Sequence, residues 1–452
     1  MSKPLWTSGD ITRAVGGESA EPFEVNGISI DTRTIQAGDL FVPLKDMRDG
    51  HDFIPMALEK GAGGILSEKP MEGAAVIIED SLQALRDMGR TGTERSEALR
   101  IAVTGSVGKT SVKEALADMF AAFGPTHKSL KSYNNHWGVP LTMARMPINS
   151  KYGIFEMGMN HAGELADLSN LLSPEIALIT TVAPAHLAHF ENVDAIADAK
   201  SEIMDGLAED GILILNADNP HTPQILRKAK GKKVITFGHD DNCDVTIVTS
   251  QTHEHGSNTR LRINAQQIDV TLLVPGEHWI MNGAACMAVA YAAGVDLRKA
   301  AKALRGVRAE SGRGEMHKLS LDGKSITVID ESYNANPTSM RAAINVLGLK
   351  HGRRLAVLGD MGELGKDELQ FHSDLAKPLE AAAVSRVIVT GECMRALKGA
   401  LPQSMRGAWA KDWDAALQAL KDEIQEGDVV LVKGSNSVGL GKLVAALKKG
   451  TA

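Results

Sequence analysis

The chain contains little of what secreted and membrane proteins are built from. Its 452 residues include only three cysteines, Cys243, Cys286 and Cys393, which have neither metal-ligand spacing nor the arrangement of a disulfide framework. Isolated structural thiols are typical of a reducing compartment. No apolar run is long enough to span a membrane, and the N-terminal residues do not form a signal peptide. We therefore expect a cytoplasmic protein with no membrane partner.

An excess of basic residues is also absent. The formal net charge is −7, which disfavours a nucleic-acid partner because phosphate binding needs a positively charged face. An apolar content of 43% with 23% charged residues is typical of a globular protein. The length is enough for about three domains, each with its own core.

The most informative stretch is residues 101–116. Its apolar start predicts a buried strand, Gly105 and Gly108 predict a tight loop, and a helix is expected from Ser111 onward. Backbone N–H groups at such a helix N-terminus bind anions. Lys109 would hold the β- and γ-phosphates of a nucleoside triphosphate, and Thr110 would bind Mg²⁺. The predicted phosphate-binding residues are Gly105, Ser106, Val107, Gly108, Lys109, Thr110 and Ser111.

This glycine motif is shorter than the general phosphate-loop pattern. The pattern here is Gly-x-x-Gly-Lys-Thr, and Val103 occupies the position where the longer pattern has a further glycine. The alternative is therefore an ordinary strand-to-helix turn. We favour phosphate binding.

Other polar side chains follow predicted strands of the same region. Strands and helices alternate through residues 86–310, as in doubly wound parallel sheets. Glu156 ends the strand at 152–156, and His186 follows the strand at 175–180. Ligands collect at the carboxyl ends of such strands. Either residue alone would ordinarily be structural, but with Lys109 and Thr110 they predict a site for phosphate and metal.

Beyond His186, the helical segment 195–203 contains Lys200, which by pattern alone would be a solvated charge. Residues 242–274 then alternate as β-structure, and residues 283–293 form an alanine-rich helix. We predict an α/β fold of three domains. Residues 1–85 form a small α/β domain, 86–310 a central phosphate-loop domain, and 311–452 a second α/β sheet of Rossmann type.

The C-terminal domain is predicted in detail. Strands are expected at 325–330, 355–359, 386–390 and 428–433, with helices at 338–349, 366–382, 413–425 and 439–449. The end of the first strand, Asp330-Glu331, resembles the metal-binding strand of an ATPase but is more than two hundred residues from Lys109. This separation suggests a nucleotide held between domains. In the N-terminal domain, pattern alone favours ordinary solvated turns for Asp31, Arg33 and the loop 49–52.

Taken together, these motifs resemble the Mur ligase family, which builds the peptide stem of peptidoglycan. The resemblance covers all three predicted domains in the family's order. It rests on the following stretches: Thr104-Gly105-Ser106-Val107-Gly108-Lys109-Thr110, 133–140 (Tyr-Asn-Asn-His-Trp-Gly-Val-Pro), Glu156-Met157-Gly158, Ala183-Pro184-Ala185-His186, the Lys200 helix, Asn282, 330–337 (Asp-Glu-Ser-Tyr-Asn-Ala-Asn-Pro), 357–365 (Val-Leu-Gly-Asp-Met-Gly-Glu-Leu-Gly) and Lys433-Gly434-Ser435.

The resemblance implies an ATP-dependent amide ligase that acts through an acyl phosphate. The expected substrates are UDP-N-acetylmuramoyl-tripeptide and D-alanyl-D-alanine, and the expected state is a monomer. Lys109 is expected to hold phosphate, and Thr110 and Glu156 to bind one Mg²⁺. His186 would bind a second Mg²⁺, supported by Lys200, which matches the lysine that the family carbamylates. Catalytic roles therefore fall on Lys109, Lys200, His186 and Glu156.

Further contacts are implied by the same resemblance. Asn282, Arg313 and Asp330 match positions that contact the adenine, the γ-phosphate and the ribose. Closure around residues 306–312 would assemble the site. Thr181 and Trp279 depart from the family, where asparagine is common at both positions. Tyr333, Asn334 and Asn336 would line the nucleotide cleft, Asp31, Thr32, Arg33, Asp49, Gly50 and His51 would hold the uridine end, and Asn134 and Asn135 would meet the sugar and phosphate.

Two alternatives differ in kind from this prediction. One is a related ligase of the same architecture, such as another stem-peptide ligase or a folylpolyglutamate synthase. The other is a regulatory protein that binds a nucleotide without catalysis. Phosphate release with defined substrates would distinguish all three.

Overall fold

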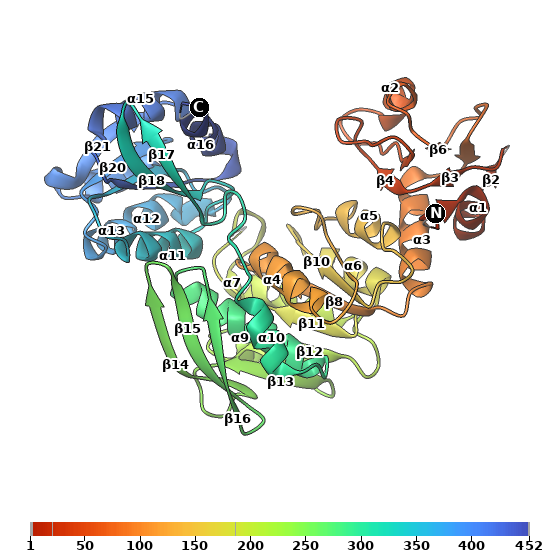
Figure 1. The fold of residues 1–452 in the computed structure, drawn as a ribbon, viewed down its shortest axis with the longest axis horizontal. Helices are drawn as coiled ribbons and strands as arrows, with labels where there is room; N and C mark the ends of the chain where they lie inside the picture. Colours follow the sequence, from red (N-terminus) through yellow and green to blue (C-terminus); the bar gives the residue numbers. More distant parts are fainter. Residues whose placement is uncertain (1–2, 20, 186, 451–452) are drawn as a thin grey trace. The chain divides into compact units, whose positions relative to one another are not determined.

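The structure, a computed structural model, describes residues 3–19, 21–185 and 187–450. By its internal packing the chain divides into two compact units. One comprises Met1–Thr104, Phe120–Leu178 and Glu202–Leu213, and the other comprises Gly105–Met119, Ile179–Ser201 and Ile214–Ala452. Strands of the described residues form sheets of five, nine and six strands and one two-stranded pair (Figure 1). No helix in this part of the chain is long and apolar enough to cross a membrane.

The five-stranded sheet lies near the N-terminus, in the first unit. Its order is β2 (Glu18–Ser19), β7 (Ala75–Ile77), β6 (Gly64–Ser67), β5 (Asp39–Phe41) and β4 (Gly27–Ser29). All neighbours pair in parallel except β2 with β7. The short strands β1 (Trp6–Thr7) and β3 (Glu24–Val25) pair beside it. The helices are α1 (Ser8–Val15), η1 (Gly50–Phe53), α2 (Ile54–Glu59) and α3 (Ser81–Glu94).

Polar contacts join this region to a central helix of the same unit, α5 (Gly138–Ala144), which packs against α3. The indole Nε1 of Trp6 donates to the Ala144 carbonyl at 2.8 Å, and Arg145 Nε donates to the Ile28 carbonyl at 2.7 Å. Trp6 is 1% exposed, with the Arg95 guanidinium stacked on its ring. Buried hydrogen bonds of this kind fix the region's orientation on α5 because breaking one would leave a buried polar group unpaired.

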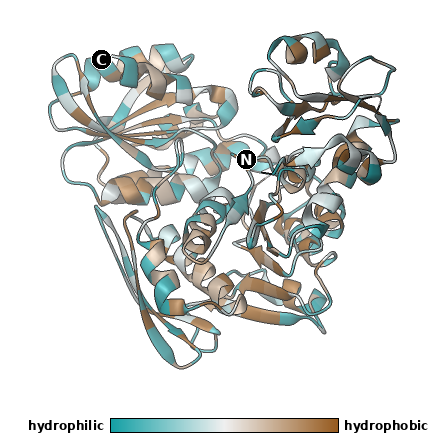
Figure 2. Ribbon diagram, turned by 45° about the vertical axis from the view of Figure 1, so that its right-hand side comes forward, coloured by the Kyte–Doolittle hydropathy of each residue, from teal (hydrophilic) through white to brown (hydrophobic). Residues whose placement is uncertain are grey.

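The nine-stranded sheet has β8 (Leu99–Thr104) between two later strands. Its order is β16 (Gln266–Leu272), β15 (Gly256–Ile263), β14 (Val245–His253), β13 (Lys233–Gly238), β12 (Ile212–Asn216), β11 (Ile176–Ile179), β8, β10 (Tyr152–Glu156) and β9 (Thr126–Lys128). Residues 101–103 and all of β10 are buried. Strands covered on both faces are continuously apolar. Figure 2 shows the central strands of this sheet mainly in brown, whereas the long strands β14, β15 and β16 are largely teal.

The helices of this region include α4 (Lys109–Ala121), α6 (Glu164–Leu172), α7 (Val193–Ser201), α8 (Thr222–Lys228), α9 (Glu277–Ala292) and α10 (Leu297–Leu304). Helix α4 begins at Lys109, two residues before the expected start. Most of α9 is buried, and it packs on β13, β14, β15 and β16. These contacts explain its alanine-rich sequence, since small side chains allow a helix to lie close to a sheet.

The six-stranded sheet lies wholly in the second unit. Its order is β17 (Glu315–Leu321), β18 (Lys324–Glu331), β22 (Val429–Lys433), β19 (Arg354–Gly359), β20 (Arg386–Thr390) and β21 (Arg406–Ala410). Only β17 with β18 is antiparallel. Helices α11 (Pro337–Gly348), α13 (Ala376–Ala381) and α14 (Met394–Ala400) cover one face, and α15 (Trp413–Glu423) and α16 (Leu440–Lys449) cover the other (Figure 1).

The structure corrects the sequence prediction in this sheet. The helix expected at 366–382 is wrong as one element, because it is divided into η4 (Gly365–Asp367), α12 (Glu368–Ser373) and α13. Pro378 has no N–H to donate to the carbonyl four residues earlier, so a continuous helix would lose a bond there. Strand β21 was not predicted, whereas β20 has the predicted bounds.

Candidate functional site

The loop between β8 and α4 has a backbone that only glycine adopts easily. Gly105 has φ of 150° and Gly108 has φ of 86°. A Cβ on Gly105 would lie 1.9 Å from Thr180 Oγ1. The loop is held by Ser106, whose N–H donates to the Thr181 carbonyl at 2.8 Å and whose hydroxyl donates to the Ala183 carbonyl at 2.9 Å. Such a close approach of backbone groups is typical of an anion-binding loop.

Two further side chains border this loop. Lys109 Nζ donates to the Gly105 carbonyl at 2.7 Å, so the ammonium folds back over the loop. A Cβ on Gly108 would lie 3.1 Å from Asn282 Oδ1 on the buried helix α9. Asn282, predicted from the resemblance, is therefore placed against the phosphate loop. Thr110 is 5% exposed in the first turn of α4.

Glu156 ends β10, where it stands opposite Val103 of β8 in the parallel ladder. It therefore lies at the sheet edge from which the chain continues into the glycine loop. Its Oε1 accepts from Asn134 Nδ2 at 2.7 Å. Its Oε2 is buried and has no hydrogen-bond partner within the described residues. A buried carboxylate oxygen without a partner is costly, and it fits a ligand of Mg²⁺, which prefers oxygen.

Lys200 is the least expected feature of the site. It is 2% exposed, on the face of α7 that also buries Ile196 and Ala197. Burial, together with the positive charge of Lys109, holds the pKa of Lys200 well below its ordinary value. The solvated charge expected from pattern alone is therefore wrong; the four-residue spacing from Ile196 was the signal that could have indicated burial. The other predicted metal ligand, His186, lies outside the described residues.

Asp330, one of the predicted nucleotide contacts, lies beside the segments that carry Arg313 and Tyr333. This carboxylate is 3% exposed; it accepts from the Gly312 N–H at 3.1 Å and from the Ser332 hydroxyl at 2.6 Å. The Arg313 guanidinium lies over the Tyr333 ring, 4.0 Å from its centre. Asn336 does something the sequence did not suggest: its Oδ1 accepts from the Ser339 N–H at 2.8 Å and caps α11.

The stretches 357–365 and 433–435, for which the sequence predicts no individual role, lie together in the structure. The Ser435 hydroxyl accepts from the Gly362 N–H at 2.7 Å. Lys433, 2% exposed, donates from Nζ to Glu331 Oε2 at 3.0 Å and to the Asn334 carbonyl at 2.9 Å. The position of these residues after parallel strands was the available signal.

The N-terminal candidates form local turns. Asp31 accepts from the backbone and guanidinium of Arg33, and this hydrogen bonding lowers the pKa of Asp31. Asp49 accepts from the N–H and Nδ1 of His51, and these bonds lower the pKa of Asp49. Thr32 is buried. Asn135 Oδ1 accepts from the Gly138 N–H at 2.9 Å at the start of α5. Each of these hydrogen bonds is of a kind common in turns and helix caps. They do not use every polar group at the surface, so a ligand could still bind there.

Comparison with known proteins places this geometry in a family. The profile described as "Mur ligase middle domain" matches residues 103–290, and that described as "Mur ligase, glutamate ligase domain" matches 312–436. The chain is 34% identical to the UDP-N-acetylmuramoyl-tripeptide–D-alanyl-D-alanine ligase of Escherichia coli, over 98% of both chains. It is 30% identical to the enzyme of the same name from Rickettsia prowazekii, over 97% of this chain and 99% of that one.

A solved structure gives the same answer for the fold. The crystal structure described as MurF from Acinetobacter baumannii matches with a TM-score of 0.86 and 29% identity, over 98% of this chain and 99% of that chain. The likeness covers the N-terminal region as well as the two parts that the family profiles match.

Proposed function

The chain belongs to the Mur ligase family, and from that premise we propose that it joins D-alanyl-D-alanine to UDP-N-acetylmuramoyl-tripeptide, with ATP converted to ADP and phosphate. The reaction supplies the pentapeptide precursor of peptidoglycan. The observation that carries the proposal is the glycine loop with Lys109 folded over it, within a full-length match to ligases of that name.

In the first step a carboxylate oxygen of the tripeptide attacks the γ-phosphorus of ATP, and ADP leaves. The amine of D-alanyl-D-alanine then attacks the carbonyl carbon of the acyl phosphate and loses a proton, and phosphate leaves. Phosphoryl transfer depends mainly on positioning and charge neutralisation. The Ser106 N–H is engaged by the Thr181 carbonyl, so we assign both roles to the backbone N–H groups of residues 107–110 and to the Lys109 ammonium.

We assign Thr110 and Glu156 to one Mg²⁺, since the unpartnered Oε2 of Glu156 fits that role. Asn134 orients the other oxygen of the carboxylate. When bound, Mg²⁺ neutralises phosphate charge. A lysine ammonium cannot bind a cation, so Lys200 fits a second Mg²⁺ site, shared with His186, only when carbamylated. Its lowered pKa favours the neutral amine, the form that reacts with CO₂.

We propose that the chain acts as a cytoplasmic monomer of three domains, residues 1–85, 86–310 and 311–452. The three large sheets lie one within each range. In the nucleotide site, Asn282 contacts the adenine, Arg313 contacts the γ-phosphate and Asp330 contacts the ribose. The cleft is also lined by Tyr333, Asn334 and Asn336. The turns at Asp31–Arg33 and Asp49–His51 hold the uridine end, and Asn134 and Asn135 hold the sugar and phosphate.

The test is phosphate release from ATP and Mg²⁺ with UDP-N-acetylmuramoyl-tripeptide, with and without D-alanyl-D-alanine. We expect release that depends on the dipeptide and a product heavier by one dipeptide less water, measured by mass spectrometry. Turnover with a free amino acid or glutamate in place of the dipeptide would instead assign the chain to a related ligase. ATP binding without turnover on any substrate would contradict catalysis.

A further inference from the structure

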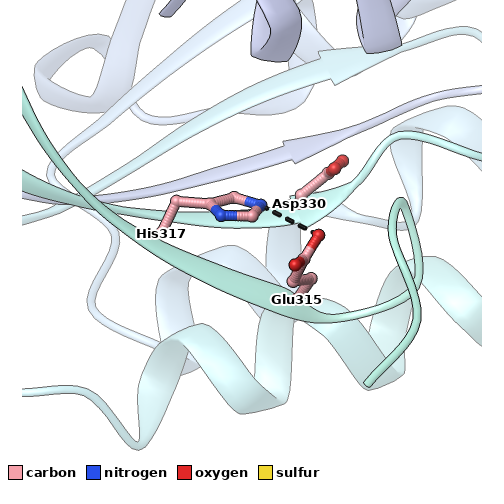
Figure 3. A group of neighbouring side chains, drawn as sticks. All are labelled: Glu315, His317 and Asp330. Carbon is pink, nitrogen blue, oxygen red and sulfur yellow. Dashed lines mark ion pairs between the residues drawn. The ribbon is translucent and has the colours of Figure 1, made fainter. Parts of the chain in front are cut away.

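The hairpin of β17 and β18 carries a group of potential metal ligands outside the phosphate loop. Glu315 and His317 are two residues apart on β17 and therefore share a face, and Asp330 stands opposite Glu315 in the antiparallel ladder. One ligand atom of each lies within 4.8 Å of the others (Figure 3). Within the described residues, this is the only group of three or more His, Cys, Asp or Glu side chains with that geometry.

Two carboxylates directly opposite each other in a ladder repel, so the arrangement favours a cation. Lys448 partly meets this need, with Nζ 3.7 Å from Glu315 Oε2. Asp330 itself is 3% exposed. The hairpin therefore keeps a buried carboxylate beside a half-buried one.

The imidazole of His317 points into this group. Its Nε2 lies 3.2 Å from Glu315 Oε2, yet the nitrogen is buried and makes no hydrogen bond within the described residues. A buried nitrogen without a partner requires an explanation. A separation of 3.2 Å is also close to the roughly 3.4 Å expected between two ligands of one tetrahedral ion with bonds of about 2.1 Å.

Asp330 is held in place by groups that would also serve a metal site. The Gly312 N–H donates to one carboxylate oxygen, and the Ser332 N–H and hydroxyl donate to the other. A carboxylate offers about four acceptor positions, so at least one is still available. Hydrogen bonds of this kind orient a ligating carboxylate and strengthen metal binding.

We propose that Glu315, His317 and Asp330 bind one divalent transition-metal ion of the Zn²⁺ or Co²⁺ class. One imidazole and two carboxylates suit such ions, whereas Mg²⁺ favours oxygen ligands throughout. Three protein ligands leave a fourth position for water or a ligand. The site does not include the Mg²⁺ ligands Thr110 and Glu156, but it shares Asp330 with the ribose contact of the proposed function, and its test is therefore made without nucleotide.

The test titrates the full chain with Co²⁺ in excess Mg²⁺, without nucleotide or substrate, and follows the visible absorption of bound Co²⁺. We expect one tight Co²⁺ per chain, displaced by Zn²⁺. His317→Gln and Glu315→Gln should each weaken binding at least about tenfold, the lower end of the effect of losing a metal site's supporting groups. Circular dichroism and thermal midpoints confirm that the variants are folded.

His255→Gln is the matched control. His255 Nε2 lies 3.1 Å from Glu254 Oε1, a pair of the same length, but the imidazole is 81% exposed and belongs to no three-residue group of the described chain. This variant should bind Co²⁺ like the wild type. Wild-type affinity in both His317→Gln and Glu315→Gln, or loss of the tight site in His255→Gln, would overturn the proposal.

Discussion

At the residue scale, the chemistry of this chain depends on how buried polar groups are paired. Lys200 and Lys433 are both 2% exposed. The ammonium of Lys433 is matched by a carboxylate and a carbonyl. Burial, and after it the positive charge of Lys109, instead lowers the pKa of Lys200. The two lysines therefore differ in their surroundings: Nζ of Lys433 is held by hydrogen bonds, whereas the surroundings of Lys200 disfavour its charged form.

His127 allows a prediction about pH. Burial lowers the pKa of His127 to about 4, against a carbonyl hydrogen bond to Thr142 that raises it. Below about pH 6.5, His127 binds a proton in the unfolded chain but stays neutral in the folded chain. The free energy of unfolding therefore decreases as the pH is lowered from about 6.5 to about 4. The loss attributable to this residue approaches roughly 3 kcal/mol, from 1.36 kcal/mol per pKa unit.

The measurement compares thermal midpoints of the wild type and His127→Gln between pH 7.5 and 4. Glutamine keeps a donor for the Thr142 carbonyl but does not titrate. We expect the wild type to lose stability relative to the variant as the solution is acidified. A difference in thermal midpoint that stays constant across this range would contradict a lowered pKa of His127.

At the scale of elements, the glycine loop leads to a second prediction. Gly105→Ala would place a Cβ 1.9 Å from Thr180 Oγ1 at a φ of 150°, so the loop must shift. Strain of 1–3 kcal/mol is typical of such positions, and we expect ATP affinity to fall roughly tenfold or more, as measured by calorimetry.

Gly73→Ala is the control for this change. Gly73 also has a positive φ, 86°, but a Cβ there would meet nothing within 4 Å. It therefore reproduces the backbone strain without the collision, and ATP should bind as to the wild type. If Gly105→Ala also binds ATP normally, the loop does not hold the phosphates.

The N-terminus of α11 leads to a third prediction. Asn336 and Ser339 form a reciprocal capping box, and loss of such a cap typically costs about 1 kcal/mol. Asn336→Ala should lower the midpoint of the thermal unfolding of the region that contains the six-stranded sheet. Asn336→Ser should largely keep the wild-type midpoint, because serine also caps helices. Equal midpoints for both variants would show that the cap contributes nothing.

Much of this arrangement could be predicted from the sequence, because strands buried on both faces are continuous apolar runs. Strands β10 and β20 lie where those runs predicted them. Strand β21 has no such run: its Arg-Gly-Ala-Trp-Ala sequence gains a strand conformation only by pairing with β20. Tertiary contacts decide such segments, and local pattern cannot.

The residues of the candidate site likewise divide into those that the sequence predicted and those that it did not. The glycine loop and the carboxylate at the end of β10 could be predicted, because each comes at the end of an apolar run that is recognisable as a strand. The cap role of Asn336 and the pairing of Lys433 with Glu331 depend on hydrogen bonds between side chains and distant backbone, which spacing does not encode. The metal ligands Glu315 and His317 were not predicted either, since their pattern is complete only when Asp330 pairs across the hairpin.

At the scale of the whole molecule, nucleotide binding should be visible as stability. A ligand at about 100 times its dissociation constant stabilises the folded state by about 2.7 kcal/mol. MgATP should therefore raise a thermal transition of the wild type. Lys109→Ala should unfold like the wild type without nucleotide and show little shift with it. A full shift in this variant would contradict the role of Lys109.

The strand order also has a consequence for biosynthesis. Strand β8, which leads into the glycine loop, lies between β10 and β11, and both are encoded after it. The ribosome must add 75 further residues, from Thr104 to Ile179, before both neighbours exist. At about 5–20 residues per second, the backbone edges of β8 remain unpaired for roughly 4–15 seconds. The nascent chain is therefore most in need of chaperone protection during this interval, before the centre of its largest sheet can close.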